Sequence, residues 1–322
     1  MQQYDTVQFL VGQGAQIDDE SYEHVWDFVL RRKCSKEQED GLRCITEAKD
    51  RDWIEDQSFP PVHKIVLGLS TKRLHQELQK NPDAVYATDA QGRTALDWAT
   101  ARAQSNHMKL LIHQGSNYNA MDSKGRSTVL HAVDSHNPEA LRIILEAGAS
   151  ADPVILNGSK RSSPLTSASF GGLAEMVRLL LHYGANINAS NPEGRTALHS
   201  VASTESVECA EILLDRGANI NEVSSNGCTP LMTAIRCNAH SVLKLFLDRH
   251  PGFLDGASLL ETIHRYADKE TISILKTHRL DPSESGTLAP SVDYASSHAL
   301  ADLHANWYGV CNAPRPQGEM VT

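Results

Sequence analysis

The sequence lacks the paired cysteines that mark many metal and redox sites. Six cysteines are scattered along the chain, and no two of them form a CxxC pair, so neither a zinc site nor a redox motif is indicated. Scattered thiols of this kind are typical of intracellular proteins, in which cysteines stay reduced. We therefore expect reduced thiols and no bound metal ion. The cysteines are Cys34, Cys44, Cys209, Cys228, Cys237 and Cys311.

The motifs of common enzyme families are also missing. The chain contains no GxSxG, no GxxxxGK[ST], no HExxH and no GxGxxG. The run from Gly158 to Ser163 resembles a phosphate loop in composition, but it lacks the preceding strand and the spacing. Asp134 and His136 are close in sequence, and no nucleophile is placed with them. We expect no catalysis and no cofactor, although a fold by itself does not exclude an activity.

Long apolar runs and an excess of basic residues are absent as well. No apolar stretch is long enough to span a bilayer, and the first twenty residues show no basic segment followed by an apolar core. Lys and Arg number 30 against 40 Asp and Glu, which gives a net charge of −10 and argues against a nucleic-acid partner. We expect a soluble intracellular protein, cytoplasmic or nuclear, that binds neither membranes nor nucleic acids.

The chain does contain a repeat. The phrase Gly-Ala-Asn-Ile-Asn begins at Gly184 and again at Gly217, a spacing of 33 residues that is the period of one solenoid class. Successive helix ends are spaced by 33, 36, 33 and 33 residues. The longer interval places extra residues between Ala151 and Ser162, which we expect to form a loop on one face. The helix ends are Gly115, Gly148, Gly184, Gly217 and His250.

Each repeat has the same expected anatomy. A Ser or Thr precedes the first helix and caps it, a run of leucines buries the second helix, and a Gly ends that helix in a left-handed conformation. His250 breaks the last rule, so the unit that ends there should be looser. No unit buries its apolar face alone, and stability must come from stacking. The predicted caps are Thr94, Ser127, Ser163, Thr196 and Thr229.

The pattern Asp-x-x-Gly-x-Thr-Pro-Leu-His-x-Ala, followed by Leu-Leu-x-x-Gly-Ala, resembles the ankyrin repeat. The resemblance covers about residues 58–251 well and most of the remainder weakly. It implies an all-α, right-handed solenoid of helix-turn-helix units joined by short hairpin loops, with about six recognisable units. The His of the motif stands at His63 and His199. Elsewhere its hydrogen bonds between units are expected to be missing, since the motif position holds Asp97, Leu130, Thr166 or Met232.

Four segments are expected along the chain. Residues 1–57 hold a half-repeat and a degenerate helical repeat, 58–251 the array, 252–311 degenerate capping repeats, and 312–322 a flexible tail. The start in mid-repeat indicates either a shortened product of a longer array or a makeshift cap. Residues 20–53 are either a degenerate repeat kept in register or an unrelated helical insertion. This combination resembles ankyrin arrays at the C-termini of large fungal regulatory proteins.

The resemblance also implies a partner-binding surface at the hairpin tips and the inner ends of the first helices. Carried onto this chain, these variable positions hold seven basic residues and two acidic ones, whereas the whole chain is acidic. Such a surface would steer an acidic segment of a partner protein, with Phe170 as a central apolar contact. The predicted contact residues are Arg93, Arg102, Lys124, Arg126, Asp134, Lys160, Phe170, Glu193, Arg195, Asn226 and Arg236.

We therefore predict a monomeric scaffold or adaptor that recognises another protein on its concave face. Three alternatives stay open. The basic residues are also consistent with an ordinary solvated surface. A closed apolar pocket with converging titratable groups would instead favour an enzyme or a small-molecule binder. Finally, the chain could be a regulatory fragment of a larger ankyrin-containing system whose output domain lies elsewhere.

Overall fold

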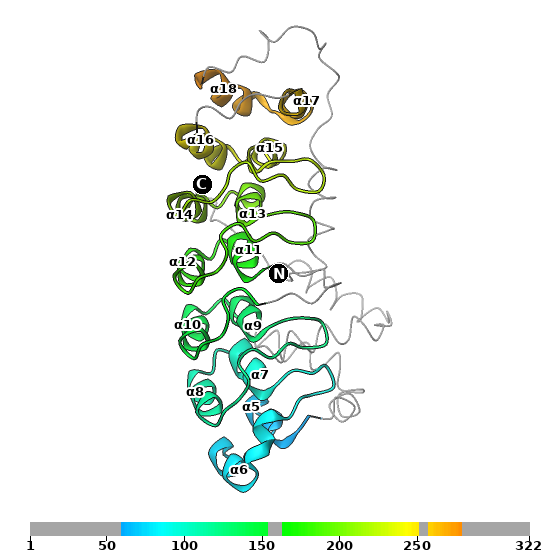
Figure 1. Ribbon diagram of the computed structural model, residues 1–322, viewed down its shortest axis with the longest axis vertical. Coiled ribbons are helices and arrows are strands. Elements are labelled where there is room, and N and C mark those ends of the chain that lie inside the picture. Colours follow the sequence, from blue (N-terminus) through cyan, green and yellow to red (C-terminus); the bar gives the residue numbers. More distant parts are fainter. Residues whose placement is uncertain (1–58, 154–162, 251–256, 279–322) are drawn as a thin grey trace, which may run out of the picture. The chain divides into compact units, whose positions relative to one another are not determined.

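The computed structural model describes residues 59–153, 163–250 and 257–278 (Figure 1). These residues are helical and contain no strand, which confirms the all-α prediction. Extended backbone within these ranges pairs in single bridges that close three hairpins at their bases. The bridges are Thr88–Thr94, Met121–Ser127 and Ser190–Thr196. The predicted half-repeat, the degenerate stretch at 1–57 and the tail at 312–322 lie outside the described residues.

The chain divides into two compact units, residues 1–149 and 150–322. The described residues of the first unit contain three helix pairs and one short 3-10 helix. They are α5 (Pro61–Leu67) with α6 (Leu74–Lys80) and η1 (Pro82–Tyr86), α7 (Ala95–Ala101) with α8 (Ser105–His113), and α9 (Thr128–Asp134) with α10 (Pro138–Glu146). The first helices pack on one another in the order α5, α7, α9, and α8 packs on α10. The unit therefore has two layers, one of first helices and one of second helices (Figure 1).

The described residues of the second unit form four helix pairs of the same arrangement. Its pairs are α11 (Pro164–Phe170) with α12 (Ala174–His182), α13 (Ala197–Thr204) with α14 (Val207–Asp215), α15 (Pro230–Arg236) with α16 (His240–Arg249), and α17 (Ala257–Tyr266) with α18 (Lys269–Thr277). Contacts run from α11 through α13 and α15 to α17, and from α12 through α14 and α16 to α18. The last pair falls in the segment for which the sequence predicts a degenerate repeat.

Local sequence signals set the helix ends. A hydroxyl side chain before the first helix accepts the backbone N–H three residues later, which satisfies one of the unpaired donors of the first turn. These caps are Thr94, Ser127, Ser163 and Thr229. The second helices α8, α10, α12 and α14 are each followed within two residues by a Gly with φ between 82° and 100°. After α16, His250 has φ −139°, and this helix runs for ten residues instead of nine.

The apolar core of each unit lies between its two helix layers. The second helices α8, α12 and α14 each bury at least one leucine of their runs, and each fully buried Leu contributes about 1.5–3 kcal/mol; these leucines include Leu111, Leu180 and Leu213. Alanines with no exposed surface allow neighbouring first helices to approach closely; they include Ala99, Ala132, Ala168 and Ala234. Trp98 is 1% exposed, so it belongs to the core and not to a contact surface.

Candidate partner-binding surface

The hairpins that precede the first helices position most of the predicted contact residues. A backbone hydrogen bond of 2.9–3.0 Å closes each hairpin four residues apart, and a Gly with positive φ lies at its tip. These closing bonds run from Asp89 to Arg93, Asp122 to Arg126, Asn191 to Arg195 and Ser224 to Cys228. Neighbouring hairpins also share one backbone hydrogen bond, because Ser123 N donates to Gln91 O and Ser225 N donates to Glu193 O, both at 2.8 Å. The tips are thus held in register within each unit.

Arg93 is neutralised inside its own hairpin. Its Nε atom donates to Asp89 Oδ2 at 2.8 Å, and Nη2 donates to Gln91 Oε1 at 2.6 Å. The guanidinium carbon lies 4.0 Å from the ring centroid of Trp98, whose Nε1 donates to the same Asp89 oxygen at 2.9 Å. Arg93 is 5% exposed. The sequence predicts that Arg93 contacts a partner protein. In the structure it contacts a carboxylate and an aromatic ring of its own repeat.

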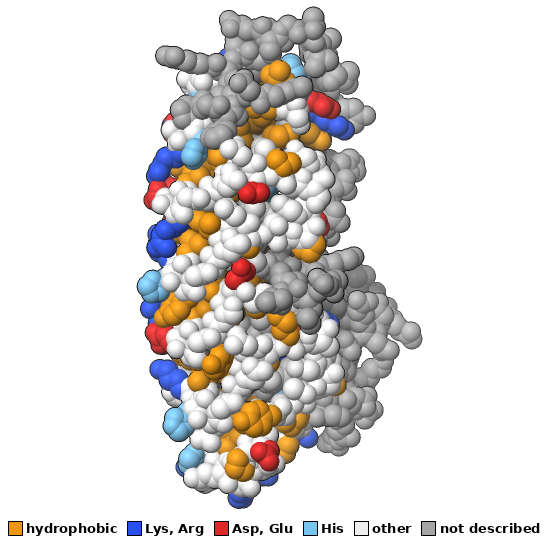
Figure 2. All heavy atoms as spheres, viewed as in Figure 1, with side chains coloured by type: hydrophobic (Ala, Val, Ile, Leu, Met, Phe, Trp, Pro, Cys, Tyr) orange, Lys and Arg blue, Asp and Glu red, His pale blue; other side chains and the backbone are white. Residues whose placement is uncertain are grey.

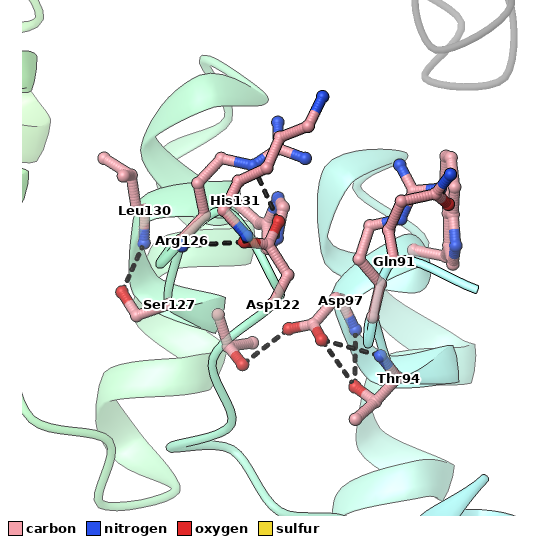
Figure 3. A network of polar contacts seen from close by, with 12 residues as sticks. Gln91, Thr94, Asp97, Asp122, Arg126, Ser127, Leu130 and His131 are labelled. Atoms are coloured by element: carbon pink, nitrogen blue, oxygen red, sulfur yellow. Dashed lines mark hydrogen bonds and ion pairs between the residues drawn. The ribbon is translucent and has the colours of Figure 1, made fainter. Parts of the chain in front are cut away.

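The next hairpin repeats this network (Figure 3). Arg126 Nε donates to Asp122 Oδ2 at 2.8 Å, and His131, at the position that corresponds to Trp98, lies 3.5 Å from the same oxygen. Burial by itself would raise the pKa of Asp122. His131 and Arg126 outweigh this effect and hold the pKa of the carboxyl far below its usual range. Arg126 is therefore also tied to an ionised carboxylate within its repeat.

Asp97 links two repeats (Figure 3). Its Oδ2 accepts hydrogen bonds from the backbone N–H and the hydroxyl of Thr94, both at 2.8 Å. Its Oδ1 accepts the hydroxyl of Thr128, the first residue of α9, at 2.6 Å. The expectation that hydrogen bonds between units are missing at this position is thus wrong. The Asp97 carboxylate binds a side chain of the next repeat, whereas the motif histidines bind a backbone carbonyl of the next repeat.

The two motif histidines make that backbone link. His63 Nε2 lies 2.9 Å from Arg93 O, and His199 Nε2 lies 2.9 Å from Cys228 O. In the second unit Thr196 N donates to His199 Nδ1, so the proton of the neutral ring is on Nε2 and points at the carbonyl of Cys228. Burial lowers the pKa of His199, which keeps the ring neutral.

The other predicted residues of the first unit lie at two places. Lys124 is exposed at a hairpin tip. Arg102 is half-buried at the C-cap of α7, and Asp134 is half-buried as the last residue of α9. In the second unit Phe170 is half-buried as the last residue of α11. Lys160 lies outside the described residues.

Arg195 has a different environment from its counterparts in the first unit. Asn191 stands where they have an aspartate, and its Oδ1 accepts the backbone N–H of Arg195 at 2.9 Å. The nearest carboxylate is that of Glu193, 3.7 Å from Arg195 Nε and on a side chain that is 52% exposed. Arg195 Nη1 is buried and has no hydrogen-bond partner in the part of the chain that the structure describes.

Arg236, the last residue of α15, lies near neutral groups. Its Nη1 donates to Cys228 Sγ at 3.0 Å, and its guanidinium carbon lies 5.0 Å from the ring centroid of Tyr266. Asn226 is exposed at the hairpin tip, where its Oδ1 accepts the hydroxyl of Ser224 at 2.6 Å. Sequence reasoning missed Tyr266, which comes from α17, thirty residues beyond Arg236.

Neither a metal-ligand cluster nor a membrane-spanning helix is present among the described residues. These residues contain no group of three or more His, Cys, Asp or Glu side chains that could hold a metal ion. None of the helices described is both long enough and apolar enough to cross a membrane. In each unit, charged and histidine side chains gather along the second helices (Figure 2).

A family model described as "Ankyrin repeats (3 copies)" matches residues 106–191 and 165–255. Within residues 106–255 the chain therefore carries ankyrin repeats. The crystal structure of the human ASB11 ankyrin repeat domain superimposes on it with a TM-score of 0.57, covering 72% of this chain and 100% of that domain at 22% identity. This similarity supports the ankyrin solenoid fold of the array.

Curated proteins share the array at higher identity. The B-cell lymphoma 3 protein homolog of Mus musculus is 34% identical over 121 residues, which are 36% of this chain and 26% of that protein. Ankyrin repeat and SOCS box protein 16 of Homo sapiens is 32% identical over 115 residues, 35% of this chain and 24% of that protein. The nuclear factor NF-kappa-B p105 subunit of Gallus gallus is 29% identical over 156 residues, 45% of this chain and 16% of that protein. The matched part is thus a minor share of each relative.

Proposed function

We propose that the ankyrin array is a monomeric protein-binding scaffold without catalysis of its own. It holds an acidic segment of its partner on the hairpin tips and the inner ends of the first helices. The observation that carries this proposal is the hairpin row of each unit, in which exposed side chains stand on backbone fixed by hydrogen bonds within and between tips. A surface fixed in this way loses little conformational freedom when a partner binds, and that favours affinity.

We infer the acidic character of the partner from the cations of the hairpin face, but from fewer of them than the sequence predicts. Arg93 and Arg126 are already paired with carboxylates of their own repeats, so they add little net positive charge. In the second unit, Arg195 and Arg236 are predicted cations with no carboxylate within 3 Å in the part of the chain that the structure describes. On a chain with net charge −10, this local excess would steer an acidic segment to the hairpin face.

We also propose that the protein acts inside the cell, in the cytoplasm or nucleus. Cys209, Cys228 and Cys237 are free thiols, as a reducing compartment requires.

Site-specific photo-crosslinking of the full chain tests the scaffold function. A photoreactive residue replaces Ser225, exposed at a hairpin tip, or Glu211, exposed on the second helix α14 as the matched control. In cell extract we expect the Ser225 probe to capture one or a few proteins that the Glu211 probe does not capture. Their yield should fall at high ionic strength, because screening weakens attraction between exposed charges.

Two results of this experiment would contradict the proposal. Equal capture at both positions would refute recognition by the hairpin face. Specific capture at Ser225 that does not change with ionic strength would keep the protein partner but refute its acidic character.

A further inference from the structure

Arg195 occupies the same hairpin position as Arg93 and Arg126. In those two repeats the residue four positions earlier is an aspartate, which is fully buried and holds the arginine Nε at 2.8 Å. In the repeat of Arg195 that position is Asn191. The internal counter-ion of the repeated network is therefore missing in this one hairpin.

The amide of Asn191 keeps the structural part of the role. Its Oδ1 accepts the backbone N–H groups of Glu193 at 3.1 Å and of Arg195 at 2.9 Å, as the aspartates do in their hairpins. An amide carries no charge, so it does not neutralise the guanidinium. The ring of the network is also absent, because Ser200 stands at the position of Trp98 and His131. The hairpin therefore has the same backbone hydrogen bonds, but Arg195 lacks the aspartate and the ring that hold Arg93 and Arg126.

The guanidinium of Arg195 is consequently left with incomplete compensation. Its side chain is 14% exposed, so it is largely removed from water, and Nη1 has no partner within the described ranges. The ion pair with Glu193 is loose at 3.7 Å and involves an exposed carboxylate. Pairs of this kind contribute little, since solvent screens them. A half-buried cation without a close anion gains more from an incoming carboxylate than a fully solvated one.

Arg236 brings a second guanidinium to the same side of the second unit. In the following hairpin Cys228 stands at the position of Arg195, and its thiol accepts from Arg236 Nη1. The hairpins of Arg195 and Cys228 share the backbone hydrogen bond from Ser225 N to Glu193 O at 2.8 Å. Arg236, bound to Cys228 Sγ at 3.0 Å, therefore lies in the repeat directly beside that of Arg195. The helices that carry or adjoin them, α13, α15 and α17, are in successive contact.

The acidic groups around this pair do not cancel its charge. Glu193 is exposed, and the carboxylate of Glu222 accepts a hydrogen bond from Asn219 Nδ2 at 2.8 Å. Tyr266, over which Arg236 stacks, also has Arg265 5.5 Å from its ring centroid, which adds a further cation. The face of aromatic rings attracts cations, so Tyr266 holds Arg236 in place without neutralising it.

We propose that Arg195 and Arg236 form a carboxylate-binding site for an Asp or Glu side chain of the partner's acidic segment. The inference rests on the proposed scaffold function and narrows its acidic contact to the second unit. Arginine suits this role because its planar fork matches the two oxygens of a carboxylate. Arg93 and Arg126 do not provide such a site, since their own aspartates already occupy their Nε groups.

The substitution Asn191→Asp tests this site by restoring the counter-ion that the other repeats have. The full chain is titrated into a fluorescein-labelled peptide of alternating Glu and Gly, and anisotropy is compared with that of the matching Gln–Gly peptide. We expect Asn191→Asp and Arg195→Gln each to weaken binding of the Glu peptide by about tenfold, because each removes a charge-assisted contact.

The matched control is Asn186→Asp, which makes the same charge change on an exposed asparagine of the same unit whose Oδ1 also accepts a backbone N–H. It should weaken binding by no more than about twofold, as expected for a surface charge. Thermal unfolding verifies that each variant is folded. Asn191→Asp should be at least as stable as the wild type, since aspartate occupies this position in two other hairpins.

The outcomes separate the site from the scaffold function. Equal binding by Asn191→Asp and wild type, or a wild-type chain that binds the Glu and Gln peptides equally, overturns the carboxylate site. In either case specific capture by the Ser225 probe still supports the scaffold. If that probe captures nothing specific, the scaffold proposal fails whatever the peptide shows.

Discussion

Replacing Asp97 with alanine is expected to weaken the contact between two neighbouring repeats. The carboxylate is 1% exposed and accepts three hydrogen bonds, two from Thr94 and one from the Thr128 hydroxyl at 2.6 Å. The substitution leaves the backbone N–H of Thr94 and the hydroxyl of Thr128 buried without this acceptor. Unsatisfied buried donors are costly, so the effect should exceed that of an ordinary surface change.

The magnitude follows from the number and type of the bonds. Hydrogen bonds to a charged group contribute about 1.5–3 kcal/mol each before the desolvation of the carboxylate is subtracted. Alanine loses these three bonds but also removes the desolvation cost of the buried carboxylate. The expected net loss is about 3 kcal/mol in the free energy of unfolding. Asp97→Asn should lose only about 1 kcal/mol, because its amide can donate to the Thr128 hydroxyl while its oxygen still accepts from Thr94.

Hydrogen exchange and urea unfolding together measure this prediction. Stability of a repeat array is a sum of repeat and nearest-neighbour terms, so exchange should rise in α7 and α9 and stay unchanged in α13 to α16. Thr128→Val removes the other side of the contact, and the double variant should be less destabilised than the sum of the single ones. A loss for Asp97→Ala below about 0.5 kcal/mol, the size of a typical surface substitution, would refute the interpretation of Asp97 as a link between repeats.

Three further predictions concern the second unit. Gly194→Ala should lower the unfolding temperature more than Gly184→Ala, although both glycines have positive φ. A Cβ at Gly194 would lie 3.1 Å from the backbone N of Ser225, whereas one at Gly184 would meet no described atom within 4 Å. Equal shifts in unfolding temperature would contradict close packing of the hairpins. Burial lowers the pKa of His199, so its contribution to stability is full above pH 6.5 and falls as the pH drops below it; a His199→Gln variant that keeps the same acid sensitivity by urea titration would exclude this source. A hydrogen bond to Asp248 of α16 raises the pKa of His278. The contribution of His278 to stability is therefore full below pH 6.5 and disappears as the pH rises through the raised pKa. If hydrogen exchange of α18 does not increase over this range, the prediction is wrong.

Much of the fold could be predicted from the punctuation of the repeat. The hydroxyl before each first helix and the glycine after most second helices act through nearby backbone, so their roles are readable from a few residues. At His250 the missing glycine predicts a looser unit; the structure shows a different helix end there, and the looseness stays a prediction. Helix pairing in each unit then follows from the period, since every pair repeats the contacts of the one before it.

The contact surface was less predictable because burial and pairing decide which charges are available. Arg93 was counted as a groove cation from its position at a hairpin, but Asp89 and Trp98 enclose it. Part of this was visible in the sequence, since an Asp precedes the Arg by four residues in two repeats and an Asn does so at Arg195. The stacking of Arg236 on Tyr266 was not visible, because it depends on how α17 packs on α15.

The backbone bond between neighbouring hairpin tips limits how this surface can diversify. Because Ser225 donates to the carbonyl of Glu193, a residue inserted between the tip and the base of either hairpin would shift the donor and break the bond. New binding preferences in the hairpins are therefore expected to arise by exchange of side chains at constant loop length. Asn191, which stands where two other hairpins have an aspartate, is a difference of that kind.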